Sequence, residues 1–208
     1  MKGYYNNNNN NNNPIQRAAK IERNTLETSI NAGVNIDGVG KTTVKTGLSF
    51  IDHLVMSFGK HSMIDITLTA KSKDGIIHHL IEDVSITLSK TIDKALSDRF
   101  QTTRFGYALV PMDDSLSYAA IDLVKRLFCN IQLKLNRNII EEVPREDLEH
   151  FVISLAQNLN ACTHIIVEYG HNDHHKLESA IKAFAIALRM AASIDHKRKG
   201  IPSTKGVI

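Results

Sequence analysis

The 208-residue chain has few of the features that mark secreted, membrane or disulfide-stabilised proteins. It contains two cysteines, Cys129 and Cys162, and neither belongs to a Cys-x-x-Cys pair, so reduced thiols are the simplest interpretation. No apolar run reaches transmembrane length, and the N-terminal region lacks the apolar core of a signal peptide. We therefore expect a cytoplasmic protein without a membrane partner.

Excess charge of one sign is also lacking. Lys and Arg number 25 against 22 Asp and Glu, and this mildly basic balance does not indicate nucleic acid as a partner. An unbroken run of asparagine, Asn6 to Asn13, cannot bury apolar surface. Residues 1–14 are therefore predicted to be a disordered Asn-rich tail, while the 42% apolar content of the chain suffices for a sizeable core.

Histidine is abundant, and six of the ten histidines belong to a pattern that occurs twice. The segment His78-His79-Leu80-Ile81-Glu82 recurs 96 positions later as His174-His175-Lys176-Leu177-Glu178. Upstream, His53 precedes the first pair by 25 residues, and His150 precedes the second by 24. This spacing predicts an internally duplicated protein.

Similar elements surround the two clusters. In each half a short apolar helix follows the single histidine, an alternating strand comes next, and His-His-x-x-Glu opens a long helix. These long helices are predicted at about His79 to Leu96 and His174 to Ala192. Two strand-like runs precede each unit, at Thr25 to Val34, Thr42 to Phe50, Leu116 to Val124 and Asn130 to Leu135.

The predicted fold class is α+β, with two β-β-α-β-α repeats, residues 15–103 and 104–195. Because each apolar helix face needs a partner, we expect two sheets with the helices packed between them.

The two clusters have the composition of metal sites. On a helix, residues four apart share a face, while an adjacent residue is rotated by about 100°. We therefore expect the second histidine of each pair to serve the ion of the other cluster. The predicted ligands of one ion are His53, His78, Glu82 and His175, and those of the other are His150, His174, Glu178 and His79.

Three imidazoles and one carboxylate suit manganese, iron or zinc, and a catalytic role favours an octahedral ion. A purely structural metal site is the alternative. His61 lies eight residues after His53, about two helical turns away, where it could line the same cavity. His164, His171 and His196 are interpreted as ordinary residues.

Further motifs stand in order along the chain from Arg23 to Ile208. They are Arg23-Asn24-Thr25-Leu26-Glu27-Thr28, Phe50-Ile51-Asp52-His53, Arg104-Phe105-Gly106, Pro111-Met112-Asp113-Asp114, Glu149-His150-Phe151, Lys182-Ala183 and Pro202-Ser203-Thr204-Lys205-Gly206. With the two histidine clusters, these motifs resemble those of the imidazoleglycerol-phosphate dehydratase family of histidine biosynthesis.

The resemblance implies dehydration of D-erythro-imidazole glycerol phosphate to imidazole acetol phosphate. It also implies two Mn²⁺ per active site and a homo-oligomer of 24 subunits with sites at subunit interfaces. Metals that bridge the ring nitrogens would stabilise an imidazolate able to expel the neighbouring hydroxyl group.

The resemblance also assigns roles to individual residues. Glu27 is the candidate general base, and residues 196–208 form a substrate-binding tail. The residues expected to bind the phosphorylated imidazole substrate are His61, Arg104, Arg126, Lys182, Ser203 and Lys205.

Two segments depart from the family pattern. Ile76-Ile77 stands where the family usually has Asp-Asp, which removes acceptors that could orient metal-bound histidines. Val124-Lys125-Arg126-Leu127 stands where the family has Ser-Gly-Arg-Pro. Two alternatives therefore remain: a metal-stabilised assembly protein with impaired catalysis, and a dinuclear metallohydrolase.

Overall fold

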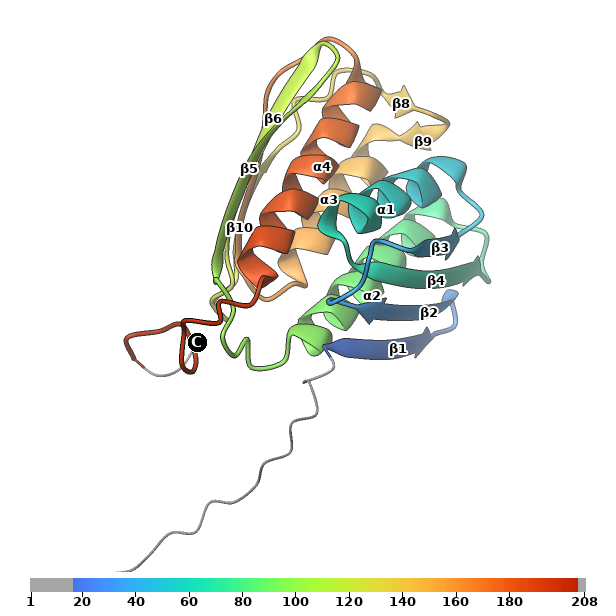
Figure 1. The fold of residues 1–208 in the computed structure, drawn as a ribbon. Helices are drawn as coiled ribbons and strands as arrows, with labels where there is room; N and C mark the ends of the chain where they lie inside the picture. The colour runs from blue at the N-terminus through green and yellow to red at the C-terminus, as the bar shows by residue number, and fades with distance from the viewer. Residues whose placement is uncertain (1–16, 206–208) are drawn as a thin grey trace, which may run out of the picture.

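The computed structural model describes residues 17–205, in which two four-stranded sheets enclose four helices (Figure 1). The first sheet has the order β1-β2-β4-β3, formed by Ala18–Asn24, Thr28–Asn35, Asp65–Ser72 and Thr42–Lys45. The second has the order β5-β6-β10-β7, formed by Phe105–Met112, Ser115–Asp122, Cys162–Tyr169 and Phe128–Gln132. In both sheets the last strand in this order runs parallel to its neighbour and the other pairs are antiparallel.

The two halves therefore have the same topology, and the predicted layers are present. The prediction of β-β-α-β-α units was wrong in strand number, because each half begins with an additional hairpin strand, β1 or β5. Both are edge strands without a fully buried face, so their sequences lack the strong apolar alternation of the inner strands. The second half also contains a short β8–β9 hairpin, Ile139–Ile140 with Val143–Pro144.

The predicted boundary between residues 103 and 104 falls between α2 and β5. The predicted Asn-rich tail, residues 1–14, lies outside the described residues, and the C-terminal tail is described as far as Lys205.

Each helix of one half packs against a helix of the other half. The helices are α1 (Ser49–Ser62), α2 (Ile77–Leu96), α3 (Arg145–Gln157) and α4 (Asp173–Ala192). Helix α1 packs against α4 and α2 against α3, while α2 also covers the first sheet and α4 the second. Residues on helices of different repeats are thereby brought face to face.

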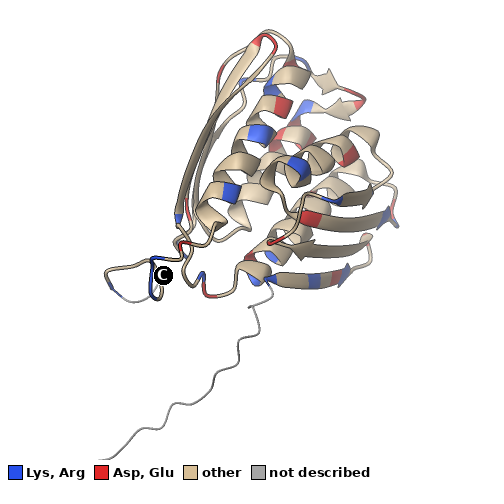
Figure 2. Ribbon diagram, in the orientation of Figure 1, with Lys and Arg blue, Asp and Glu red and all other residues tan. Residues whose placement is uncertain are grey.

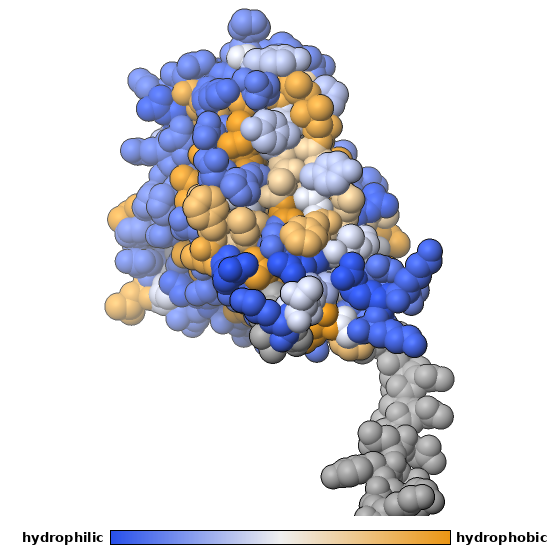
Figure 3. Space-filling view, turned by 90° about the vertical axis from the view of Figure 1, so that its left-hand side faces the viewer, coloured by the Kyte–Doolittle hydropathy of each residue, from blue (hydrophilic) through white to orange (hydrophobic). Residues whose placement is uncertain are grey.

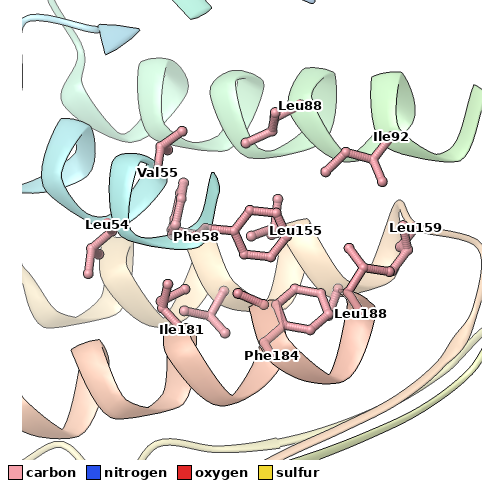
Figure 4. Close-up of a cluster of buried hydrophobic side chains, with 14 of the residues drawn as sticks. Leu54, Val55, Phe58, Leu88, Ile92, Leu155, Leu159, Ile181, Phe184 and Leu188 are labelled. Atoms are coloured by element: carbon pink, nitrogen blue, oxygen red, sulfur yellow. The ribbon is translucent and has the colours of Figure 1, made fainter. Parts of the chain in front are cut away.

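Apolar side chains from all four helices fill the space between the sheets (Figure 4). Phe58 on α1 and Phe184 on α4 lie 5.4 Å apart, measured between ring centroids. Leu88 on α2 and Leu155 on α3 are also buried here. Because each such side chain contributes about 1.5–3 kcal/mol on burial, this core fixes how the helices are placed.

The outer surface is mixed in character. Lys and Arg are interspersed with Asp and Glu along the ribbon (Figure 2). On the outer face of the second sheet, apolar side chains lie among polar ones, including the exposed Phe105, Tyr107 and Leu109 of β5 (Figure 3). Among residues 17–205, no helix is both long enough and apolar enough to cross a membrane.

Candidate metal centre

All eight predicted metal ligands lie in the first two turns of the four helices. His53 is the fifth residue of α1, and His150 is the sixth residue of α3. Each His-His pair occupies the second and third positions of its helix, α2 or α4, and Glu82 and Glu178 occupy the sixth. The repeat in the sequence is therefore a repeat in three dimensions.

The first cluster joins His53, His174 and Glu178, whose ligand atoms all lie within 4.8 Å of one another. Nε2 of His53 is 3.7 Å from Oε1 of Glu178, and Nε2 of His174 is 3.5 Å from Oε2. Nε2 of His53 is buried and lacks a hydrogen-bond partner among the described residues. A buried, unpaired imidazole nitrogen facing a second imidazole and a carboxylate fits a borderline divalent ion.

The second cluster joins His78 on α2 and His150 on α3, whose ring centroids are 5.1 Å apart. Nδ1 of His78 lies 2.6 Å from Oδ1 of the buried Asp147, which leaves Nε2 to face outward. Glu82 follows His78 by four residues and so shares its helix face.

The predicted division of ligands was wrong for the two single histidines. His53 lies with His174 and Glu178, and His150 lies with His78, so each faces the cluster of the other repeat. The cause is the packing of α1 on α4 and of α2 on α3. The expectation that His174 and Glu178 share a helix face is confirmed by their 3.5 Å contact.

The second histidine of each pair turns away from its neighbour. The ring of His175 is inclined by 84° to that of His174, and its Nδ1 lies 2.5 Å from Oδ1 of Asp114 in the β5–β6 turn. Nδ1 of His79 lies 2.7 Å from Oδ2 of Asp74. This hydrogen bond raises the pKa of His79 above its ordinary value.

Glu27 lies beside His79, with 3.9 Å between its Oε1 and Nδ1 of the imidazole. The sequence placed Glu27 on a strand, but it occupies the turn between β1 and β2, and its side chain is 54% exposed. Asp83 of α2 holds both sides of this hairpin, because it accepts hydrogen bonds from Arg23 and Thr28. The hairpin therefore presents a carboxylate next to a candidate metal ligand.

His61 and Lys182 lie near the first cluster. Nζ of Lys182 is 2.9 Å from Oε1 of Glu178, and this pairing holds the pKa of Glu178 below its ordinary value although burial alone would raise it. Burial, followed by the charge of Lys182, lowers the pKa of His61. Glu178 is therefore anionic and His61 neutral near neutral pH.

The other expected substrate-binding residues are not part of this cluster in the structure. Arg104 is bound by both carboxylate oxygens of Asp122 and donates a further hydrogen bond to the carbonyl oxygen of Pro202. It thereby holds the segment that carries Ser203 and Lys205. Arg126 is exposed in the loop between β6 and β7.

Arg104 and the segment that it holds are distant from the first cluster. The amide of Arg104 donates to the carbonyl of Ala191 at the C-terminal end of α4, whereas His174 lies at the N-terminal end. His174 and Ala191 are seventeen positions apart in α4, which corresponds to about 26 Å of helix length. One copy of the chain does not bring Arg104, Ser203 and Lys205 to its own His174.

Sequence reasoning missed four carboxylates that lie beside the paired histidines. They are Asp147 at His78, Asp74 at His79, Glu141 at His174 and Asp114 at His175. They come from helix α3, one loop and two hairpin turns, so no regular spacing connects them to the histidines. Only Asp114 belongs to a motif that the sequence singled out.

Comparison with known proteins identifies the same family in every case. A family model described as imidazoleglycerol-phosphate dehydratase matches residues 46–188. Enzymes of that name from Chlorobium luteolum and Dehalococcoides mccartyi are 43% and 41% identical to the chain. These matches cover 92% and 93% of this chain and 96% and 98% of the relatives.

Two solved structures are also similar. Imidazoleglycerol-phosphate dehydratase from Staphylococcus aureus has a TM-score of 0.77 and 25% identity, covering 86% of this chain and 99% of its own. The enzyme from Pyrococcus furiosus, solved in complex with (S)-C348, has a TM-score of 0.75 and 33% identity. That match covers 90% of this chain and all of the other.

Proposed function

The chain belongs to the imidazoleglycerol-phosphate dehydratase family, lyases of histidine biosynthesis, and we propose that it performs this dehydration with two Mn²⁺ ions. Its substrate is then D-erythro-imidazole glycerol phosphate, and its product is imidazole acetol phosphate. The proposed compartment is the cytoplasm, in keeping with the two free thiols.

The observation that carries the proposal is the cluster of His53, His174 and Glu178. It offers two imidazole nitrogens and the carboxylate of Glu178, whose pKa is lowered by Lys182. Among residues 17–205, Nε2 of His53 is buried and has no hydrogen-bond partner. When bound, paired ions supply Lewis acidity to the imidazole ring of the substrate and hold it in place. His78, His150 and Glu82 are the corresponding residues for the other ion.

The remaining residues have roles that follow from their positions. Glu27 extends from a turn beside His79, where an exposed carboxylate can remove a proton from a carbon atom of the substrate. Lys182 keeps Glu178 charged, and the four carboxylates at Nδ1 leave Nε2 of each paired histidine available as a ligand.

We further propose that each active site forms between copies of the chain in a large homo-oligomer, with 24 subunits as the expected number. His79 and His175 point away from the clusters of their own chain, so they are available to complete the sites of a neighbour. The separation of Arg104, Ser203 and Lys205 from His174 supports the same arrangement, because a neighbouring copy can supply cations for the substrate phosphate.

Incubation of Mn²⁺-loaded protein with imidazole glycerol phosphate tests the proposed reaction. A dehydratase yields the ketone imidazole acetol phosphate and keeps the phosphate ester intact. Release of inorganic phosphate without ketone would indicate a dinuclear metallohydrolase instead. Neither product from protein that retains its ions would indicate an assembly protein without catalysis.

A further inference from the structure

The loop before α2 contains one carboxylate, Asp74, that contacts both the helix start and His79. We propose that Asp74 is a positioning residue that fixes the orientation and tautomer of His79 as a metal ligand. The inference rests on the proposed function, because it assigns His79 to a metal site. It deepens that function because it identifies which residue orients His79 when isoleucine occupies positions 76 and 77.

The two oxygens of Asp74 have different partners. Oδ2 lies 2.7 Å from Nδ1 of His79. Oδ1 accepts hydrogen bonds from the amide of Ile76 at 2.9 Å and from the hydroxyl of Ser72 at 3.1 Å. The hydroxyl of Ser72 in turn accepts a bond from the amide of Gly75 at 2.9 Å. The carboxylate is therefore held in one orientation by the backbone of its own loop.

In the second repeat, the helix cap and the contact to the second histidine come from two different residues. Asn172 caps α4 by accepting a hydrogen bond from the amide of His174, and Asp114 binds Nδ1 of His175 from another element. In the first repeat the residue at the N-cap is Ile76, whose side chain makes no capping bond. Asp74 accepts a hydrogen bond from the amide of Ile76 itself, which fixes the loop rather than capping α2, and its other oxygen binds His79. His79 therefore keeps an acceptor although positions 76 and 77 are isoleucine.

The acceptor determines which imidazole nitrogen can bind a metal. A carboxylate at Nδ1 requires a proton on that nitrogen, which leaves the lone pair of Nε2 available. An asparagine at position 74 would keep its oxygen on the amide of Ile76 and turn its NH₂ group toward His79. Nδ1 would then have to accept, the proton would move to Nε2, and that nitrogen would no longer be a ligand.

The variant Asp74→Asn separates this role from a structural one, because asparagine retains the bond to Ile76. Mn²⁺ affinity is measured by competition with a fluorescent chelator, alongside the thermal midpoint. Asp98→Asn is the matched control, since Asp98 also accepts a bond from the amide two residues later, that of Phe100, but lies at the far end of α2. Asp74→Ala, which removes the turn bond as well, serves as a second variant.

For Asp74→Asn we expect affinity for one of the two Mn²⁺ ions to fall roughly 10–100-fold while the thermal midpoint of the metal-free protein is unchanged. Asp98→Asn should bind both ions as the wild type does. Wild-type affinity in Asp74→Asn, or a loss in Asp74→Ala alone that accompanies unfolding, would overturn the role. The affinity measurement does not depend on turnover. A wild-type chain that binds Mn²⁺ but does not dehydrate the substrate would therefore contradict the proposed function without contradicting the role of Asp74.

Discussion

At the scale of single residues, each of the paired histidines has a carboxylate close to its Nδ1. Asp147 and Asp114 lie within 2.6 Å of Nδ1 of His78 and His175 respectively. A neutral imidazole held in this way offers Nε2 as its ligand atom and has little freedom to rotate. The geometry is therefore set before an ion arrives, which reduces the reorganisation needed on binding.

Replacing Glu27 by glutamine tests its role as the base. The side chain lies in an exposed turn, so the fold and the metal ligands should be unaffected. We expect kcat to fall by roughly 10²- to 10⁴-fold because the amide cannot accept the proton. The Mn²⁺ content, measured by mass spectrometry of the metals, should remain that of the wild type. Glu22→Gln on exposed β1 is the matched control, and near-normal turnover in Glu27→Gln would exclude the role.

The pairing of histidines across the repeats leads to a second prediction. His53→Ala and His174→Ala remove ligands of the same ion, so the double variant should lose no more metal than either single one. About half of the wild-type Mn²⁺ should remain, because the site built on His78 and His150 keeps its ligands. His53→Ala combined with His78→Ala should empty both sites. If this second pair instead keeps half of the metal, the division seen in the structure is incorrect.

At the scale of the elements, the close approach of β5 to α4 depends on Gly106. A Cβ atom at this position would overlap the carbonyl oxygen of Ala187 and lie 2.7 Å from the amide nitrogen of Ala191. Both are helix backbone atoms that cannot move independently. The glycine of the Arg104-Phe105-Gly106 motif thereby sets the distance between the second sheet and the helix that carries His174.

Gly106→Ala should therefore lower the free energy of unfolding by about 3 kcal/mol, measured by urea denaturation of the metal-free protein. Gly33→Ala on β2 is the matched control. Its Cβ would meet the hydroxyl of Thr67 and the side chain of Lys20, both of which can move aside. Equal stability of the two variants would show that the contact between β5 and α4 is not tight in solution.

Helix faces and the repeat could be predicted from the sequence, because spacing alone places His174 and Glu178 together. The edge strands β1 and β5 could not, since β1 has no fully buried residue and the large apolar residues of β5, Phe105, Tyr107 and Leu109, lie on its exposed face. The partner of each helix could not be predicted either. A helix face carries the same apolar stripe whether it packs within its own repeat or across to the other, so His53 was assigned to the wrong cluster.

At the scale of the whole molecule, the proposed catalytic and phosphate-binding residues lie at opposite ends. Glu27 is in the β1–β2 turn, while the segment of Lys205 leaves the fold near the start of β5 (Figure 1). An imidazole glycerol phosphate molecule is far shorter than the roughly 26 Å of α4 that separates His174 from the Arg104 end. In the proposed arrangement, a complete site therefore draws on two copies of the chain.

This arrangement predicts that two inactive variants restore each other. Glu27→Gln removes the base and Lys205→Ala removes a phosphate-binding cation, and each alone should have little activity. The two variants are co-expressed with different affinity tags, and mixed particles are purified through both tags. With random assembly, roughly a quarter of the sites then contain wild-type Glu27 from one chain and wild-type Lys205 from another. Activity should then approach a quarter of the wild-type value, measured as imidazole acetol phosphate formed. If both residues came from the same chain, no mixed site would be intact, and activity would stay at the average of the two single variants.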